Sequence, residues 1–185
     1  MIKMKTFKAA AALVLLASVS AFAANNNSAV STVTLTAILP ETLTVSLDQT
    51  AVNFALTAGS ATNAGSVPIV ATTTWALGAG RASVQLYAYI DTAAAALTGP
   101  VNIAGTTITA TVGGVGAGNF ATDIASFLGS AGTGLPSPIF TQALTAGTLV
   151  GVHSSSVALN IDLTSLPALP VGTYTGTLHF MAVAI

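Results

Sequence analysis

The sequence contains no cysteine, and only 5% of its residues are charged. Ordinary globular domains carry about 25% charged residues. Without cysteine there can be no disulfide and no thiolate chemistry, so stability must come from apolar packing and from hydrogen bonds within sheets. A disordered chain combines low hydrophobicity with high charge. Because this chain shows the reverse, we expect it to fold.

Positive charge is especially scarce. Arg81 is the only arginine or lysine after residue 8. Nucleic-acid binding needs several cations at phosphates, and attraction to an anionic membrane surface needs a basic cluster, so we expect neither partner. An isolated molecule with so few charges would have a sticky surface. We therefore expect other copies of the chain to cover much of that surface.

The chain opens with a basic segment followed by an apolar one. Residues 3–8 contain three lysines, residues 9–19 are apolar, and residues 21–23 form a small-x-small cleavage site. This pattern is typical of a secretory signal peptide, here residues 1–23. We expect export through the periplasm to the cell surface or the medium, and a single mature domain over residues 24–185.

The rest of the chain is dominated by alternation of apolar and polar residues with a period of two, which predicts half-buried strands. The clearest runs are 42–47, 83–90, 156–163 and 173–180. Clusters rich in glycine, proline and serine predict loops at 78–80, 113–119, 129–138 and 167–172, and one helical turn is predicted at 123–128. Many short strands with almost no helix predict an all-β fold, a sandwich or a barrel.

An outer-membrane β-barrel is the main alternative architecture, because its strands alternate in the same way. Such barrels usually end on an aromatic residue and carry aromatic girdles. This sequence ends on Ile185 and is only 6% aromatic. The β-sandwich is therefore favoured.

Catalytic and metal-binding patterns are weak. His153 could serve as a base, but no Gly-x-Ser-x-Gly motif accompanies it, and we interpret it as a loop residue. His153 and His179 together are too few for a zinc site, and His179 is predicted to face solvent from an edge-like strand. The glycine run 113–118 lacks the ending of a phosphate loop. We expect no enzyme activity, no metal and no cofactor.

Two tyrosines, Tyr87 and Tyr89, fall on the polar face of one predicted strand. They are candidate exposed contacts for another subunit or a sugar. The alternative is that tyrosine simply favours strands, or that a loop covers it. Trp75 is predicted to lie in the core.

Both ends of the sequence have strand character. After Pro170 no proline or charged residue blunts the alternating run that leads to Ile185, and signal cleavage would free the strand-like segment 25–39. Unpaired strand edges invite strand addition, and a head-to-tail contact of this kind builds a fibre.

The C-terminal pattern resembles a known family. Gly172 stands fourteen residues from the end, and Pro170-Val171-Gly172-Thr173-Tyr174 leads into an alternating strand. This resembles the final strand of bacterial pilus subunits of the chaperone–usher route, including spore-coat-U-like subunits. The resemblance implies an incomplete immunoglobulin-like antiparallel sandwich that a neighbour's N-terminal extension completes. It also implies a periplasmic chaperone and an outer-membrane usher as partners.

The resemblance assigns roles to particular residues. A donor strand within residues 24–39 would present Val33, Leu35, Ala37 and Leu39. The acceptor strand would include Gly172, Tyr174, Leu178 and Phe180.

Three functional hypotheses follow from the sequence. The first is a secreted structural subunit of a surface fibre or extracellular matrix, assembled from copies of itself by strand addition. The second is a monomeric adhesin or carbohydrate-binding module that uses Tyr87 and Tyr89. The third is a small outer-membrane barrel.

Overall fold

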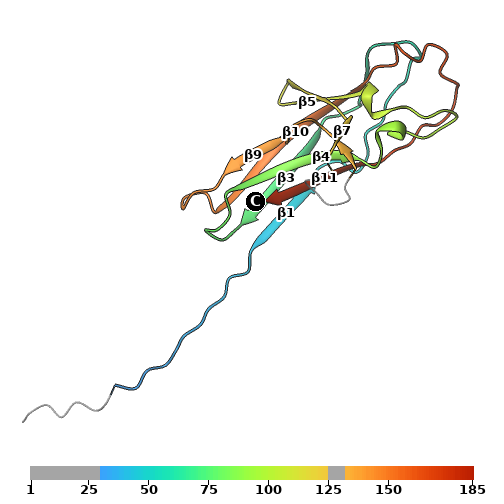
Figure 1. Cartoon of the computed structure of the whole chain (residues 1–185). Helices are drawn as coiled ribbons and strands as arrows, with labels where there is room; N and C mark the ends of the chain where they lie inside the picture. The colour runs from blue at the N-terminus through green and yellow to red at the C-terminus, as the bar shows by residue number, and fades with distance from the viewer. Residues whose placement is uncertain (1–29, 125–131) are drawn as a thin grey trace, which may run out of the picture. The chain divides into compact units, whose positions relative to one another are not determined.

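A computed structural model describes residues 30–124 and 132–185 (Figure 1). The predicted signal peptide and most of the predicted helical turn, residues 125–128, lie outside these residues. Residues 39–185 form one compact unit. Residues 30–38 fall outside that unit; they are exposed and adopt no regular secondary structure.

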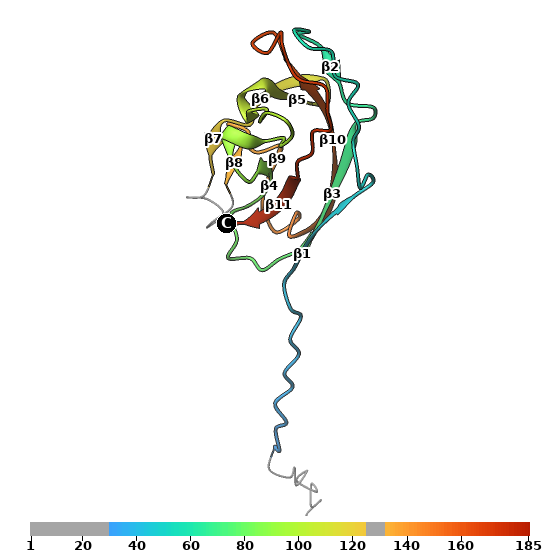
Figure 2. The same ribbon diagram turned by 90° about the vertical axis from the view of Figure 1, so that its right-hand side faces the viewer.

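The described strands form two antiparallel sheets that face each other (Figure 2). The six-stranded sheet has the order β1-β3-β10-β5-β6, and β2 also pairs with β10. The five-stranded sheet has the order β11-β4-β8-β7, and β9 also pairs with β4. This arrangement confirms the predicted all-β sandwich.

The strands of the six-stranded sheet are β1 (Thr42–Leu47), β2 (Asn63–Ala64), β3 (Ile69–Ala76), β5 (Ile108–Val112), β6 (Val115–Asn119) and β10 (Val150–Ile161). Those of the five-stranded sheet are β4 (Ser83–Ile90), β7 (Thr122–Asp123), β8 (Thr133–Gly134), β9 (Phe140–Ala143) and β11 (Leu178–Ala184). Two short 3-10 turns, η1 (Ala93–Ala95) and η2 (Gly105–Thr107), lie between β4 and β5.

Alternation along β3 shows how the sequence specifies the two faces of a sheet. Ala71, Thr73 and Trp75 point into the sandwich and are buried, whereas Thr72 and Thr74 point outward. Because the side-chain period of a strand is two, a slip of one residue would expose the whole buried set. The hydrophobic pattern therefore holds the register between β3 and its neighbours β1 and β10.

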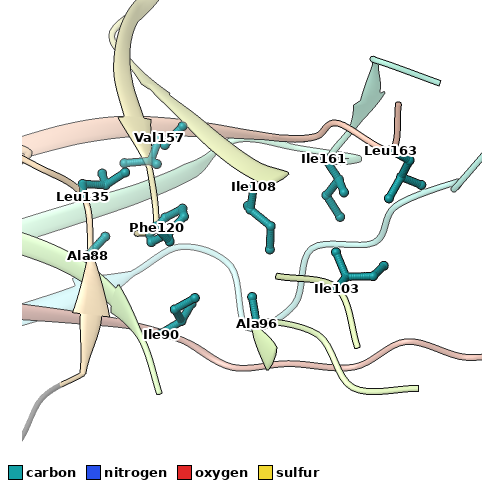
Figure 3. Packing of buried hydrophobic residues seen from close by; sticks show 11 residues of the cluster. Ala88, Ile90, Ala96, Ile103, Ile108, Phe120, Leu135, Val157, Ile161 and Leu163 are labelled. Atoms are coloured by element: carbon teal, nitrogen blue, oxygen red, sulfur yellow. The ribbon is translucent and has the colours of Figure 1, made fainter. Parts of the chain in front are cut away.

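The main core lies between the two sheets (Figure 3). Both sheets and the β4–β5 connection contribute to it. Its buried members are Ala88, Ile90, Ala96, Ile103, Ile108, Ala110, Phe120, Leu135, Val157, Ile161 and Leu163. A smaller cluster of Trp75, Leu77 and Val84, with Phe140 packed against it, occupies the end of the sandwich near the β3–β4 turn. The prediction that Trp75 is a core residue is confirmed, since it is 4% exposed.

The loop predicted at 113–119 is wrong, because this segment contains β6. Gly113 and Gly114 adopt positive φ angles of 56° and 85°. Two such residues form the tight turn that suits a hairpin, and Val112 pairs with Val115 across it. Glycine here permits a reversal of direction rather than a long loop.

The predicted strand at 173–180 is displaced toward its C-terminal end, since β11 begins at Leu178. Before that point the chain pairs with a different segment. Thr175 and Thr98 exchange two backbone hydrogen bonds, of 2.9 and 2.8 Å. A Cβ atom on Gly176 would collide with the carbonyl oxygen of Ala96, so the absence of a side chain allows this close approach.

The core makes a direct stability prediction. Leu86 is fully buried at 0% exposure, whereas Val150 is 70% exposed. We expect Leu86→Ala to lower the free energy of unfolding by about 2–5 kcal/mol, because it removes apolar packing and leaves a cavity. Val150→Ala should change it by less than about 0.5 kcal/mol. Urea unfolding of both variants would measure this, and equal effects would contradict the assigned core.

An open groove as the candidate functional site

Two edge strands meet on one side of the sandwich. β1 is the edge of the six-stranded sheet and β11 is the edge of the five-stranded sheet. The two strands lie close to each other, as Figure 1 and Figure 2 both show. They belong to different sheets, and no ladder joins them in the described part of the chain.

One end of this side is closed by polar contacts. The Arg81 guanidinium forms a 2.9 Å salt bridge to Glu41, just before β1, and its Nη1 lies 3.5 Å from the carbonyl oxygen of Ala184 at the end of β11. The Gly78 backbone N–H donates a 2.7 Å hydrogen bond to Glu41 Oε1. The hydrogen bonds from Arg81 and from Gly78 lower the pKa of Glu41, and Glu41 in turn raises the pKa of Arg81.

Toward the other end the two sheets separate and leave a groove of about 890 Å³. Its lining includes Leu47, the last residue of β1, and Leu178, the first residue of β11. One wall is residues 49–54 and the other is residues 169–178. The lining residues are consecutive in both walls, so the groove follows these two segments along their length. Within the described chain, no backbone hydrogen bond joins the two walls.

The floor of the groove is the hydrophobic core itself. Side chains from both sheets reach it, namely Ile69, Ile90, Ile108, Phe120 and Leu159. Val52, Phe54 and Leu56 on one wall and Tyr174 on the other are partly buried. None of the described residues that line the groove is charged. The lining also includes polar residues such as Gln49, Asn53 and Thr177, so the site suits an uncharged occupant with both apolar and polar groups.

The backbone of β11 is paired on one side only. Ile185 and Ser83 exchange backbone hydrogen bonds of 2.9 and 3.1 Å, and Thr175 does the same with Thr98. Residues of an antiparallel strand alternate between bonding one neighbour and bonding the other. The odd-numbered positions of this segment therefore bond inward to their sheet. The even-numbered positions, Leu178 and Phe180 among them, direct N–H and C=O groups to the open side.

All four predicted acceptor residues line the groove: Gly172, Tyr174, Leu178 and Phe180. The Tyr174 hydroxyl donates a 2.7 Å hydrogen bond to the carbonyl oxygen of Pro170, which fixes the ring beside the wall. A Cβ atom on Gly172 would come within 2.5 Å of Pro100 Cγ, so a glycine is needed for this packing. Leu178 and Phe180 pack against the main core.

The predicted donor residues precede β1 in the chain and are exposed. Val33, Leu35 and Leu39 are 82%, 91% and 87% exposed, and Ala37 is exposed as well. These residues form no strand in the structure. A strand needs a partner to satisfy its backbone groups, so these residues would form a strand only by pairing with a sheet edge.

The tyrosine prediction is wrong for Tyr87. This residue is only 8% exposed, its hydroxyl donates a 2.7 Å hydrogen bond to Gln85, and burial raises its pKa. Tyr89 is half-buried and stacks on His179, with ring centroids 4.9 Å apart. His179 Nε2 lies 3.1 Å from Asp91 Oδ1. Tyr89, His179 and Asp91 therefore form a small polar-aromatic cluster on the outer face of the five-stranded sheet.

His153 is also not where the sequence pattern predicted it. It lies on β10 rather than in a loop, and it stacks on Phe140 with ring centroids 3.8 Å apart. The two histidines are on different sheets. Across residues 30–124 and 132–185, no three histidine, aspartate or glutamate side chains lie close enough to share a metal ion. In the same ranges no helix is long and apolar enough to cross a membrane.

The chain matches no protein-family model, no curated protein and no solved structure. The site is therefore defined by its geometry alone: an uncharged groove that opens onto the core beside an unpaired strand edge.

Sequence reasoning missed the wall formed by residues 49–54. This segment has no alternation that marks it as part of a site, and it becomes a wall only because the chain leaves β3 after Asp48. Two contacts fix this departure, the Asp48 N–H bond to Val70 at 3.1 Å and the bridge between Phe54 and Gly65.

The Glu41–Arg81 pair gives a pH-dependent prediction. Because the pKa of Glu41 is lowered from its ordinary value of 4.5 in the folded state, ionised Glu41 stabilises the fold above that value. This contribution is lost as the pH falls through the lowered pKa. Glu41→Gln should therefore reduce Tm slightly at pH 7, and the difference should shrink as the pH falls below 4.5 and disappear below the lowered pKa. Thermal unfolding followed by circular dichroism at several pH values would measure it; a constant difference would contradict the assignment.

Proposed function

We propose that the protein is a secreted structural subunit of a surface fibre, built by strand exchange between copies of the chain. In this proposal the segment 30–39 of one copy enters the groove of the next and pairs with the open edge of β11. The observation that carries the proposal is the groove itself, because it leaves core side chains beside unpaired backbone groups.

A strand in this position would satisfy both needs of the groove. Its backbone would bond the even-numbered positions of residues 174–182, which face the open side. Its inward side chains would contact the apolar floor. Burial of an exposed valine or leucine contributes about 1.5–3 kcal/mol for each side chain. The five large hydrophobic residues of the segment, Val30, Val33, Leu35, Ile38 and Leu39, are among the most exposed in the described chain.

The chemical match supports a copy of this chain as the occupant. Residues 30–39 carry no charge, and neither does the described lining of the groove. The segment alternates apolar residues with threonine over residues 33–37, so one face would enter the groove and the other would stay in solvent. An exchanged strand would complete an immunoglobulin-like sandwich, as in the pilus subunits that the C-terminal pattern resembles.

Head-to-tail exchange does not close on itself, so it produces a fibre. The predicted signal peptide supports assembly outside the cytoplasm. The resemblance supports a periplasmic chaperone and an outer-membrane usher, which would hold the groove before the next subunit arrives. These partners are part of the proposal.

The exchange makes a face-specific prediction for residues 30–39. Leu35→Asp places a charge on the inward face and should reduce polymer yield more than tenfold, since it removes about 1.5–3 kcal/mol of apolar burial and adds the cost of a buried carboxylate. Thr34→Asp is the matched control on the opposite face and should assemble normally. Polymer can be measured by size-exclusion chromatography and negative-stain microscopy.

Deletion of residues 24–39 provides a second variant for the same test. It should abolish polymer while the remaining sandwich is still secreted and folded, as judged by circular dichroism. Unchanged polymer after this deletion would overturn the proposal. Equal loss from Leu35→Asp and Thr34→Asp would show that the segment acts through charge or solubility and not through one inserted face.

A second candidate function is carbohydrate binding on the outer face of the five-stranded sheet. The cluster of Tyr89, His179 and Asp91 favours it, because an aromatic ring beside a hydrogen-bonding carboxylate suits a sugar ring. Tyr87 no longer belongs to this candidate as an exposed contact, since it is buried.

The carbohydrate candidate predicts that Tyr89→Ala abolishes sugar binding by a monomeric protein. Val183→Ala is the control that should leave binding intact. Val183 lies on β11, on the same outer face of the sheet as His179 and Tyr89. A glycan array followed by titration calorimetry would measure both variants. A monomer that binds no glycan, or binding that Tyr89→Ala leaves unchanged, would exclude this candidate.

A further inference from the structure

The outer face of strands β1, β3 and β10 is an uncharged surface, here called the threonine face. Its cross-strand rows follow from the register. Thr44, Thr74 and Val152 form one row, and Ser46, Thr72 and Ser154 form the next. The Thr72 and Ser154 hydroxyls lie 2.8 Å apart, which confirms that their side chains share this face. The row beyond Val152 contains Thr42, Ala76 and Val150.

The threonine face exposes apolar groups without any charge beside them. Val150 and Val152 are 70% and 64% exposed. The sequences of β1, β3 and β10 contain no aspartate, glutamate, lysine or arginine. Charged residues flank these strands: Glu41, which pairs with Arg81, and Asp48 stand beyond the two ends of β1, and Asp162 follows β10. Soluble proteins usually protect an exposed sheet with charges, and this face lacks that protection.

We infer that the threonine face pairs with the threonine face of another copy of the chain, and thereby joins neighbouring fibres side by side. An uncharged face of threonine methyls and valines matches a second uncharged face, because neither surface must desolvate an ion. The face is also continuous with β1, the strand that precedes one wall of the groove. This inference rests on the proposed fibre, since the fibre repeats the face on every subunit.

The size of the face explains why repetition matters. Three strands about 4.8 Å apart and about seven residues long cover roughly 330 Å² in each copy. A pair would bury roughly 650 Å² in total, below the approximately 1,000 Å² expected of a stable interface. Two isolated subunits therefore associate weakly, whereas two fibres with many aligned faces associate strongly through multivalency.

Val152→Lys tests the inference in the full secreted chain, with Val115→Lys as the control. Val115 is similarly exposed, at 72%, but lies at the β5–β6 turn, away from the threonine face. Wild-type and Val115→Lys fibres should form bundles that pellet at low speed. Val152→Lys should form fibres of normal length that stay single, with at least a tenfold decrease in pelleted protein. Bundles of Val152→Lys equal to wild type would overturn the inference.

Cross-linking separates this inference from the strand-exchange proposal. The chain has no native cysteine, so Val152→Cys gives one defined thiol, and Val115→Cys is its control. In a fibre preparation a short bismaleimide should link Val152→Cys copies and leave Val115→Cys copies unlinked; without fibres the links should be few, because isolated subunits pair only weakly. Absence of such links would overturn face-to-face pairing even if fibres are present. Wild-type fibres that stay single but bind insoluble polysaccharide would also overturn it, in favour of a carbohydrate partner.

Discussion

Strand β11 hydrogen-bonds to β4 along one edge, and the groove exists because no described residue pairs with the other edge. The even-numbered backbone groups of residues 174–182 face the open side, and the groove beside them is floored by core side chains. A closed sandwich would have neither feature. Because β11 is paired on one side only, its open edge is a template for pairing with a further strand.

The scarcity of charge affects two surfaces of the protein. In the groove it leaves a lining without ionic groups, so an uncharged strand can enter without desolvating an ion. On the threonine face it leaves valine and threonine exposed in regular rows. Charged residues are absent from the described lining of the groove and from the strands of the threonine face; Asp48 stands at the end of β1, and Glu41 and Arg81 pair with each other at the closed end of the groove. Both surfaces therefore suit uncharged partners, which in the proposed fibre are other copies of the chain.

Alternation was sufficient to predict much of the fold. The runs at 42–47 and 83–90 are strands at those positions, because every second residue is apolar and turns toward the core. Alternation predicts a strand at 173–180, but the register with β4 begins at Leu178, and Thr175 bonds to Thr98 instead. The glycine run at 113–119 predicts a loop because glycine lacks strand propensity, although two glycines with positive φ form a hairpin turn.

The sequence by itself determined the composition of the site: a cysteine-free, nearly uncharged chain with alternating segments, and an acceptor segment whose four predicted residues share one groove. Local pattern is enough for this, because the period of a strand decides which residues share a face. Only the tertiary structure decided that the groove begins at Leu47, where β1 ends, that residues 49–54 form the second wall, and that Tyr87 is buried. These features depend on pairing between segments far apart in the chain, and local alternation does not specify which strands pair with each other.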